Sequence, residues 1–304
     1  MGLNFSGPWV MWSLLKDFFK FNVAVMVVVT SAIGYGIGLR VEQGISFSHF
    51  LFSMAGIFIL TTGSLSLNEV QEWKYDRLMP RTSKRPIPEG KLTVRYAIVI
   101  SAIHLILGSM ILFKISYLAG VVGLSTAFFY NVLYTMFWKR KWAFGAVPGA
   151  IPGALPLTLG YACINNYILS SESIYLFMIL FLWQMPHFWS LAIRFKEDYA
   201  SGGFPVLPLI HGDERTKYYI ALYTFVYVGL ALISPLFIHA KFFYMILVVP
   251  FCIKLLYEFA KYFRSTKEKA WLPFFLWTNF SLLAFLFAPL LDKWYLFFTG
   301  TVTL

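Results

Sequence analysis

The chain has 304 residues, of which 59% are hydrophobic, 20% aromatic and only 13% charged. A soluble domain of this length needs no such apolar excess, so the composition excludes an ordinary soluble enzyme and indicates several membrane spans. The net charge of +11 raises nucleic acid as a partner, but the basic residues are distributed over many short segments between apolar runs. Membrane topology and anionic lipid explain that distribution better, so we expect no nucleic-acid partner.

Residues 1–19 combine aromatic side chains with Lys16 and lack the apolar core and cleavage site of a signal peptide. They predict an amphipathic segment lying in the membrane interface. Beyond this segment, apolar runs of about 20 residues, long enough to cross about 30 Å of hydrocarbon, recur along one membrane domain. The prediction is an all-α polytopic protein with nine spans, near 20–39, 46–67, 96–113, 116–136, 143–162, 173–193, 218–238, 242–260 and 271–290.

The basic residues predict the orientation of these spans. Of the 25 Lys and Arg residues, 20 fall in the N-terminal segment and in the connections after the even-numbered spans. Short connections rich in Lys and Arg remain in the cytoplasm, so we expect the N-terminus inside and the C-terminus outside. Short connections and the lack of a transit peptide favour a bacterial inner membrane.

Acidic residues cluster in the two long inner connections, after spans two and six, which together hold eight of the 14. Carboxylates contribute little to orientation, so topology does not explain this clustering. We therefore expect the functional groups at the cytoplasmic side.

An acidic stripe follows the second span. Asn68, Glu72 and Asp76 recur at four-residue intervals, which places them on one helix face about 6 Å apart. Amide and carboxylate oxygens suit Mg²⁺, which takes one or two protein carboxylates and leaves other positions to water and substrate phosphate. The alternative is a solvated helix end that makes contacts within its own turn.

Basic side chains accompany this stripe and would bind a diphosphate through guanidinium and ammonium groups, although orientation alone also places cations here. The candidates are Arg81, Lys84, Arg85, Lys139, Arg140, Arg194 and Lys196. Next to the last two lie Glu197 and Asp198, and a second acidic face could hold a second Mg²⁺ bridging the same diphosphate. Asn131 and Tyr134, before Lys139, would form a further wall of the pocket.

His187 lies at the inner end of the sixth span, and an ionisable residue near the membrane is a functional hypothesis. The alternatives are a hydrogen-bonded interfacial side chain, an axial ligand to haem iron or a proton acceptor. Cys163 and Cys252 lie about 90 residues apart and predict neither a metal site nor a disulfide framework.

Three motifs carry a family resemblance over roughly residues 20–290. The pattern N-x3-E-x3-D of residues 68–76, followed by RT-x2-RP at 81–86, resembles the first acidic motif of the UbiA-type intramembrane prenyltransferases. The segments WQMPHF at 183–188 and R-x-KEDY-x3-GFP at 194–205 are similar to the protohaem IX farnesyltransferases, or haem O synthases, within that group.

The resemblance implies a nine-helix bundle around a cavity in which farnesyl diphosphate ionises with Mg²⁺ and the farnesyl group joins the vinyl group of haem b. Asn68, Glu72 and Asp76 would then serve the first metal site, and Asp198, with Glu197, the second. Four residues beyond Asp198 the chain has Gly202, where many relatives have another Asp. A haem A synthase or assembly components of the terminal oxidase are implied as partners.

Three alternatives compete with this reading. An aromatic prenyltransferase, acting on a quinone precursor or a chlorophyll-like acceptor, would use the same chemistry. A secondary transporter would place its ionisable residues near the bilayer midplane, where this chain has only Lys254 and His104. A purely structural role in oxidase assembly is the third alternative, and the intact acidic stripe weighs against it.

Overall fold

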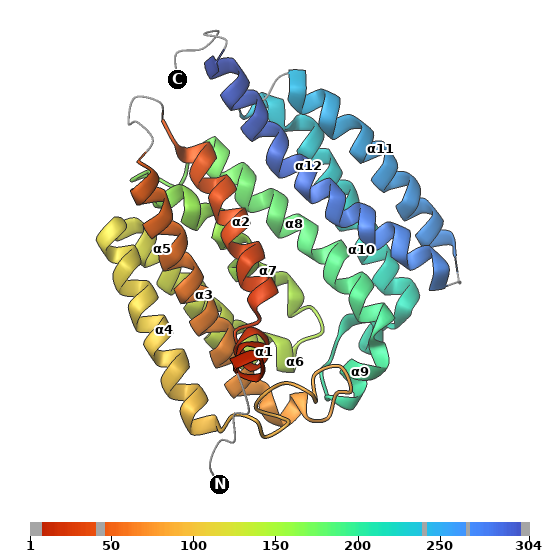
Figure 1. The fold of residues 1–304 in the computed structure, drawn as a ribbon. Coiled ribbons are helices and arrows are strands. Elements are labelled where there is room, and N and C mark those ends of the chain that lie inside the picture. Colours follow the sequence, from red (N-terminus) through yellow and green to blue (C-terminus); the bar gives the residue numbers. More distant parts are fainter. Residues whose placement is uncertain (1–7, 41–45, 239–241, 266–267, 299–304) are drawn as a thin grey trace.

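The computed structural model describes residues 8–40, 46–238, 242–265 and 268–298, and this part of the chain is helical without any strand (Figure 1). The long helices run side by side in one bundle. The elements are α1 (Pro8–Phe18), α2 (Phe21–Gly38), α3 (Phe47–Asp76), α4 (Val94–Ile115), α5 (Tyr117–Phe128), η2 (Phe129–Trp138), α6 (Lys139–Lys141), α7 (Ala146–Ala162), α8 (Ser171–Arg194), α9 (Lys196–Ser201), α10 (Leu207–Ile233), η3 (Ser234–Leu236), α11 (Phe242–Arg264), η4 (Glu268–Ala270) and α12 (Trp271–Phe298).

Eight helical stretches of the described chain are long and apolar enough to cross a membrane. One of them joins α5, η2 and α6 into a single stretch, Tyr117–Lys141. The remaining predicted span, 143–162, corresponds to α7, which has only 17 residues and contains Pro152 and Pro156. The all-helical membrane fold is therefore confirmed, whereas the count of nine spans remains a prediction.

The connection after α8 differs from the sequence-based expectation, because residues 194–217 are largely helical. They contain α9 and the beginning of α10, which starts at Leu207 with a proline in its first turn. Gly212 breaks the helix at φ 80° and ψ 165°, a conformation that glycine adopts without the steric cost of a side chain. Hydropathy alone detects only the apolar part that follows, so the predicted span 218–238 covers only part of α10, and its bounds remain a prediction.

α7 lies in the middle of the bundle and packs against α2, α5 and α8. A Cβ atom on Gly34 of α2 would lie 2.0 Å from the carbonyl oxygen of Leu157, and one on Gly160 of α7 would overlap the carbonyl oxygen of Ser31. The missing side chains let the two backbones approach closely, as small residues do between membrane helices. This contact sets one wall of the cavity described below.

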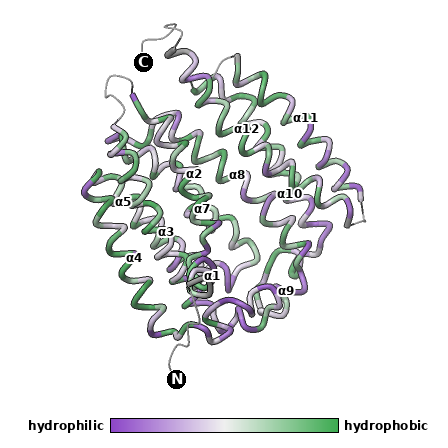
Figure 2. Tube along the Cα trace, viewed as in Figure 1, coloured by the Kyte–Doolittle hydropathy of each residue, from purple (hydrophilic) through white to green (hydrophobic). Residues whose placement is uncertain are grey.

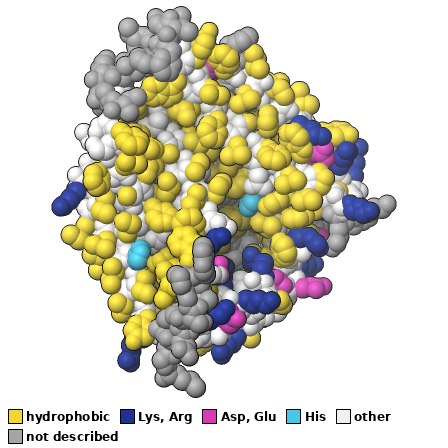
Figure 3. All heavy atoms as spheres, viewed as in Figure 1, with side chains coloured by type: hydrophobic (Ala, Val, Ile, Leu, Met, Phe, Trp, Pro, Cys, Tyr) yellow, Lys and Arg dark blue, Asp and Glu magenta, His cyan; other side chains and the backbone are white. Residues whose placement is uncertain are grey.

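Polar residues are gathered at one end of the bundle, here called the charged end. Figure 2 shows hydrophilic segments around α1, α9 and the connections beside them, and mainly hydrophobic helices above. In the space-filling view, Lys, Arg, Asp and Glu cluster over this lower end and toward the right, whereas apolar side chains cover most of the remaining face (Figure 3). Large apolar side chains such as Ile106, Leu222 and Ile253 are exposed on the flanks, as expected for helices facing lipid.

Candidate active site

A cavity of about 370 Å³ lies between α2, α3, the α5–η2 segment, α7 and α8. Its walls are polar toward the charged end and apolar toward the middle of the bundle. The polar lining comprises Lys20, Asn68, Glu72, Arg85, Tyr130, Tyr134, Lys139 and Gln184. The apolar lining includes Val27, Leu60, Leu65, Pro156, Leu159 and Phe188. Such a cavity can take an amphiphile with a charged head and a hydrocarbon tail.

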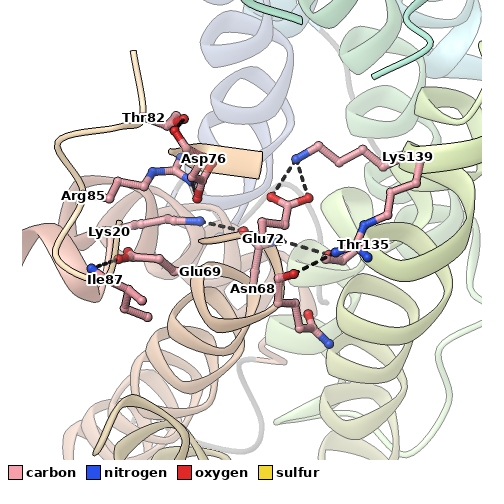
Figure 4. A network of polar contacts seen from close by, with 12 residues as sticks. Lys20, Asn68, Glu69, Glu72, Asp76, Thr82, Arg85, Ile87, Thr135 and Lys139 are labelled. Carbon is pink, nitrogen blue, oxygen red and sulfur yellow. Dashed lines mark hydrogen bonds and ion pairs between the residues drawn. The ribbon is translucent and has the colours of Figure 1, made fainter. Parts of the chain in front are cut away.

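Two residues of the predicted acidic stripe, Asn68 and Glu72, line the cavity. Asp76 lies one turn further along α3, in the same network of polar contacts (Figure 4). Asn68, Glu72 and Asp76 lie on one face near the end of α3, and each is almost completely buried. Both carboxylate oxygens of Glu72 accept hydrogen bonds of 2.7 Å from the Lys139 ammonium group. Asn68 donates a 3.0 Å hydrogen bond to the hydroxyl of Thr135, which ties α3 to η2.

Asp76 pairs with Arg85 of the connection that follows α3. The Arg85 guanidinium donates to one Asp76 oxygen at 2.6 Å, and the hydroxyl of Thr82 donates to the Asp76 backbone carbonyl at 3.0 Å. The other Asp76 oxygen, Oδ1, is buried and has no hydrogen-bond partner among the described residues. A buried carboxylate oxygen of this kind remains available to a cation or a donor.

Two further residues belong to this group, and the sequence analysis missed both. Lys20, in the left-handed conformation between α1 and α2, donates a 2.7 Å hydrogen bond to the Asn68 side-chain oxygen. Glu69 is fully buried and accepts a 3.0 Å hydrogen bond from the Ile87 backbone NH. Glu69 lies three residues before Glu72 and seven before Asp76, a helical spacing that could have identified it. Lys20 offered no such signal, because only the fold brings α1 to the end of α3.

Burial lowers the pKa of Lys20 from its ordinary 10.5 to about 7. The Arg85 guanidinium acts in the same direction, whereas the Glu72 carboxylate opposes the shift. Burial thus disfavours the charged form of this ammonium group, and an anion that enters the cavity favours it.

The η2 segment carries the predicted residues Asn131 and Tyr134. Its backbone is a π-helix, whose wider turn is common at functional sites. Tyr134 lines the cavity and stacks with Tyr130 at a centroid distance of 6.0 Å. Asn131 lies behind this surface and donates to the Ser64 hydroxyl at 2.5 Å, so it supports the wall and does not line it. Arg140 donates to the Gln71 carbonyl at 2.8 Å and braces α6 against α3.

The second acidic group reaches the site only at its rim. Asp198 of α9 lies 3.8 Å from Arg81, and both side chains are partly exposed. Lys139 lies 4.7 Å above the ring of Phe204, so the segment after α9 folds toward the same mouth. Lys84, with Arg81 and Arg85, lines an outer hollow that shares Lys20 with the cavity.

Four predicted residues lie away from the cavity. Arg194 lines a separate pocket, Lys196 pairs with Asp213 at 2.9 Å, and Glu197 is exposed. The His187 ring stacks on Trp183 at 4.5 Å and lies 4.9 Å from Phe275 of α12, on the flank of α8 away from the cavity lining. Its Nδ1 atom is buried without a hydrogen-bond partner in the described chain.

The donor set fits a hard divalent cation, although no three acidic, His or Cys side chains of the described chain converge on one point. The stripe supplies an amide oxygen and two carboxylates, and Asp76 Oδ1 is unpartnered. Mg²⁺ needs few protein ligands, because phosphate and water complete its octahedron. The residues that would hold it are Asn68, Glu72 and Asp76. Their present partners, Lys20, Lys139 and Arg85, would have to release the oxygens that they bind.

A helical membrane bundle with a carboxylate-and-cation site at one end of an apolar cavity defines an intramembrane enzyme for an amphiphilic substrate. The model of the UbiA prenyltransferase family matches residues 27–280. The chain therefore belongs to the UbiA prenyltransferase family and is an integral membrane prenyltransferase.

Relatives and solved structures agree with this assignment. The chain is 50% identical to a protoheme IX farnesyltransferase of Bdellovibrio bacteriovorus, over 93% of this chain and 97% of that protein. It is 32% identical to protoheme IX farnesyltransferase 1 of Pseudomonas putida, over 94% and 95% of the two chains.

The fold is similar to that of a digeranylgeranylglyceryl phosphate synthase, with a TM-score of 0.74, 20% identity and coverage of 92% of this chain and 98% of the other. It is also similar to a UbiA homologue from Archaeoglobus fulgidus bound to DMAPP and Mg²⁺, with a TM-score of 0.68, 19% identity and coverage of 91% and 99%.

Proposed function

We propose that this enzyme joins the farnesyl group of farnesyl diphosphate to the terminal carbon of a vinyl group of haem b. Water then adds to the other vinyl carbon and loses a proton, which yields haem O with its hydroxyl group, together with diphosphate. The observation that carries the proposal is the combination of the buried Asn68–Glu72–Asp76 stripe with 50% identity to a protoheme IX farnesyltransferase. The segment WQMPHF at 183–188, which is similar to the protohaem IX farnesyltransferases, supports haem as the acceptor.

The charges of the site support a metal-bound diphosphate. Lys20, Arg85 and Lys139 face three carboxylates, Glu69, Glu72 and Asp76, so the polar wall is close to neutral by itself. A multiply charged diphosphate entering this wall would be uncompensated without accompanying cations, and burying unpaired charge is costly. When bound, Mg²⁺ supplies that compensation and stabilises the leaving group as the bond from carbon to oxygen breaks.

The protein's own residues then have distinct tasks. Lys139 and Arg85 exchange their carboxylate partners for diphosphate oxygens, and Lys20, which is bound to Asn68, adds a third donor. Arg81 and Lys84 guide the anion at the outer hollow. Tyr130 and Tyr134 present aromatic faces beside the developing allylic cation, which such faces stabilise, and the apolar lining keeps water from it.

The volume of the cavity suits one substrate, so we expect the prenyl diphosphate and the acceptor to occupy two neighbouring pockets. At about 370 Å³ it lies near the lower end of the range for ligand sites, about 300–1,000 Å³, and suits one prenyl diphosphate. A smaller pocket of about 150 Å³ adjoins it and shares Tyr134, Lys139 and Phe188. We propose that one edge of the acceptor reaches the allylic carbon from this side, beside Phe188 and Trp189 of α8.

We further propose that the protein lies in a bacterial inner membrane with its charged end in the cytoplasm. The excess of Lys and Arg in the connections at that end supports this orientation. Diphosphate would then be released on the cytoplasmic side. A haem A synthase or oxidase assembly components would receive haem O within the membrane.

The test is incubation of the purified, detergent-solubilised protein with haem b, farnesyl diphosphate and Mg²⁺, followed by mass spectrometry of the extracted haem. We expect a mass gain equal to one farnesyl group plus one hydroxyl group, and no gain when EDTA removes the metal. Prenylation of an aromatic quinone precursor in place of haem would assign the enzyme to the other branch. Full activity in EDTA would refute the metal-bound diphosphate.

A further inference from the structure

The pocket that contains Arg194 lies outside the proposed active site and has its own composition. It occupies about 520 Å³ where α8, α10, α11 and α12 end or begin, and it shares no lining residue with the cavity. Three cations line it, Arg194, Lys217 and Arg264, together with the acidic residues Asp213 and Glu214. The proposed prenyl transfer gives these charged residues no role, because they do not line the cavity.

Part of this charge is already compensated within the protein. Asp213 pairs with Lys196 at 2.9 Å, and Arg194 lies 6.0 Å from the Trp271 ring. Lys217 donates to the Ser265 carbonyl at 2.8 Å and lies 5.1 Å from the Tyr262 ring, which leaves two of its three donor hydrogens for other acceptors. The pocket therefore retains hydrogen-bond donors for an anionic group of a ligand. The exposed Glu214 beside them can pair with an ammonium group of the same ligand.

Two further donors in the pocket wall lack partners. The Tyr262 hydroxyl and the Trp271 indole NH are both buried and make no hydrogen bond to any described residue. Tyr262 is only 5% exposed, so water does not readily satisfy its hydroxyl. Unsatisfied buried donors are uncommon in folded proteins, so each of these two calls for an acceptor, such as an oxygen of a bound anion.

The surface beside the pocket is apolar and faces away from the bundle. Tyr218 lines the pocket and is 65% exposed, and Leu222 and Phe225, one and two turns further along α10, are both 58% exposed. These three residues share one helix face, so a hydrophobic stripe runs from the mouth of the pocket toward the middle of the membrane. A soluble anion would make no use of this stripe, whereas an acyl chain would.

We propose that this pocket binds the phosphodiester headgroup of a membrane glycerophospholipid, with an acyl chain along Tyr218, Leu222 and Phe225. Lys217 and Arg264 contact the phosphate, and Tyr262 and Trp271 donate to its oxygens after small side-chain shifts. Basic pockets between helices at one membrane face are typical lipid headgroup sites. The inference is independent of the prenyl transfer proposed above.

Lipid retention by the purified full-length protein tests this site. Phosphatidylglycerol and phosphatidylethanolamine are added separately to delipidated protein, and bound lipid is counted by native mass spectrometry. The double variant Lys217→Met/Arg264→Gln should bind about 25-fold more weakly, since each basic residue contributes about fivefold near a membrane surface. Lys91→Met, an exposed lysine in the connection after α3, is the matched control and should bind as the wild type.

The two lipids separate an anionic from a zwitterionic headgroup, and a charge-dependent loss with either one supports the site. Equal retention by wild type, double variant and control would overturn it. Binding of glycerol phosphate as tightly as of the lipids would also overturn it, because the stripe would then contribute nothing. So would capture of haem but of neither phospholipid. Lys217→Met alone, with an expected loss of about fivefold, replaces the double variant if that protein unfolds.

Discussion

Both carboxylate oxygens of Glu72 accept hydrogen bonds from Lys139. Replacing Glu72 by glutamine removes the negative charge and keeps the length and shape of the side chain. We expect Glu72→Gln to lower turnover by about 10²–10³-fold, the usual cost of removing one group that stabilises a developing anion. The measurement is the rate of haem farnesylation at saturating substrates and Mg²⁺. Glu89→Gln, the same change at an exposed residue, should retain the wild-type rate, and equal rates for both variants would remove Glu72 from the metal site.

Lys20 makes diphosphate binding depend on pH. Because its pKa is lowered to about 7, the ammonium group is charged below that pH and becomes neutral as the pH rises through it. We expect the affinity of the wild type for Mg²⁺-diphosphate to fall by up to about tenfold between pH 6 and pH 8, beyond the change caused by the ligand's own protonation.

Lys20→Arg isolates that contribution, because a guanidinium stays charged throughout this range. The affinity of each protein for Mg²⁺-diphosphate is measured by calorimetry at each pH. The protonation of the ligand affects both proteins equally, so the difference between their pH profiles reports on Lys20 alone. Identical pH profiles would show that Lys20 does not titrate in this range or does not contact the ligand.

At the scale of single residues, the sequence predicted a group that the fold brings together: Asn68, Glu72, Asp76, Arg85, Tyr134 and Lys139. Helical spacing identified the first three, since a stripe on one helix depends only on local geometry. Lys20 was not predicted, because its contact with Asn68 joins residues 48 positions apart. Arg194 was predicted to bind the diphosphate but lines another pocket. The sequence near a helix end does not show which pocket a basic residue lines.

Among the elements, α2 and α7 depend most on the absence of side chains. Gly34→Ala would place a Cβ atom 2.0 Å from the Leu157 carbonyl oxygen, so the helices must separate. We expect a loss of about 1–3 kcal/mol, the usual cost of overpacking, seen as a lower melting temperature in detergent. Gly229→Ala on α10 meets no atom within 4 Å and should be neutral or slightly stabilising. Equal melting temperatures would show that the backbones are less close.

The helices themselves were predictable because each is a long apolar run, but two local features were not. The π-helix of η2 arises within a segment whose hydropathy is ordinary, and this segment packs against α3 and α7. The early start of α10 before Gly212 lies in a polar segment that hydropathy cannot distinguish from a loop. Both depend on tertiary packing, which a linear pattern does not contain.

The whole molecule has one charged end, and its orientation can be measured. Lys91 lies in the connection after α3 at that end, and Tyr117 begins α5 at the opposite end; both are exposed. In intact cells we expect a membrane-impermeant maleimide to label Tyr117→Cys but not Lys91→Cys, and the reverse in inverted vesicles. The native Cys163 and Cys252 are buried and give a low background. The opposite labelling pattern would reverse the proposed orientation.

The arrangement of helices around the cavity could not be predicted from the sequence. Glu72 and Lys139 meet across 67 positions, and cavity residues come from helices that begin as far apart as Phe21 and Ser171. Composition determines that such a chain lies in the membrane, whereas the choice of neighbours follows from packing between many similar apolar surfaces. The family motifs indicated the bundle only by resemblance.

The closed ion pairs of the polar wall give the cavity a means of rejecting unwanted lipids. A bilayer contains isoprenoid alcohols and quinone tails whose hydrocarbon parts would fit the same apolar lining. Such molecules are uncharged, so they cannot replace Glu72 and Asp76 as partners of Lys139 and Arg85. Both ion pairs therefore stay closed when such a molecule approaches. The ion pairs open favourably only for a headgroup that binds the basic residues through anionic oxygens and brings a cation for the carboxylates. Entry therefore depends on the headgroup, and an abundant neutral prenyl lipid remains a poor competitor.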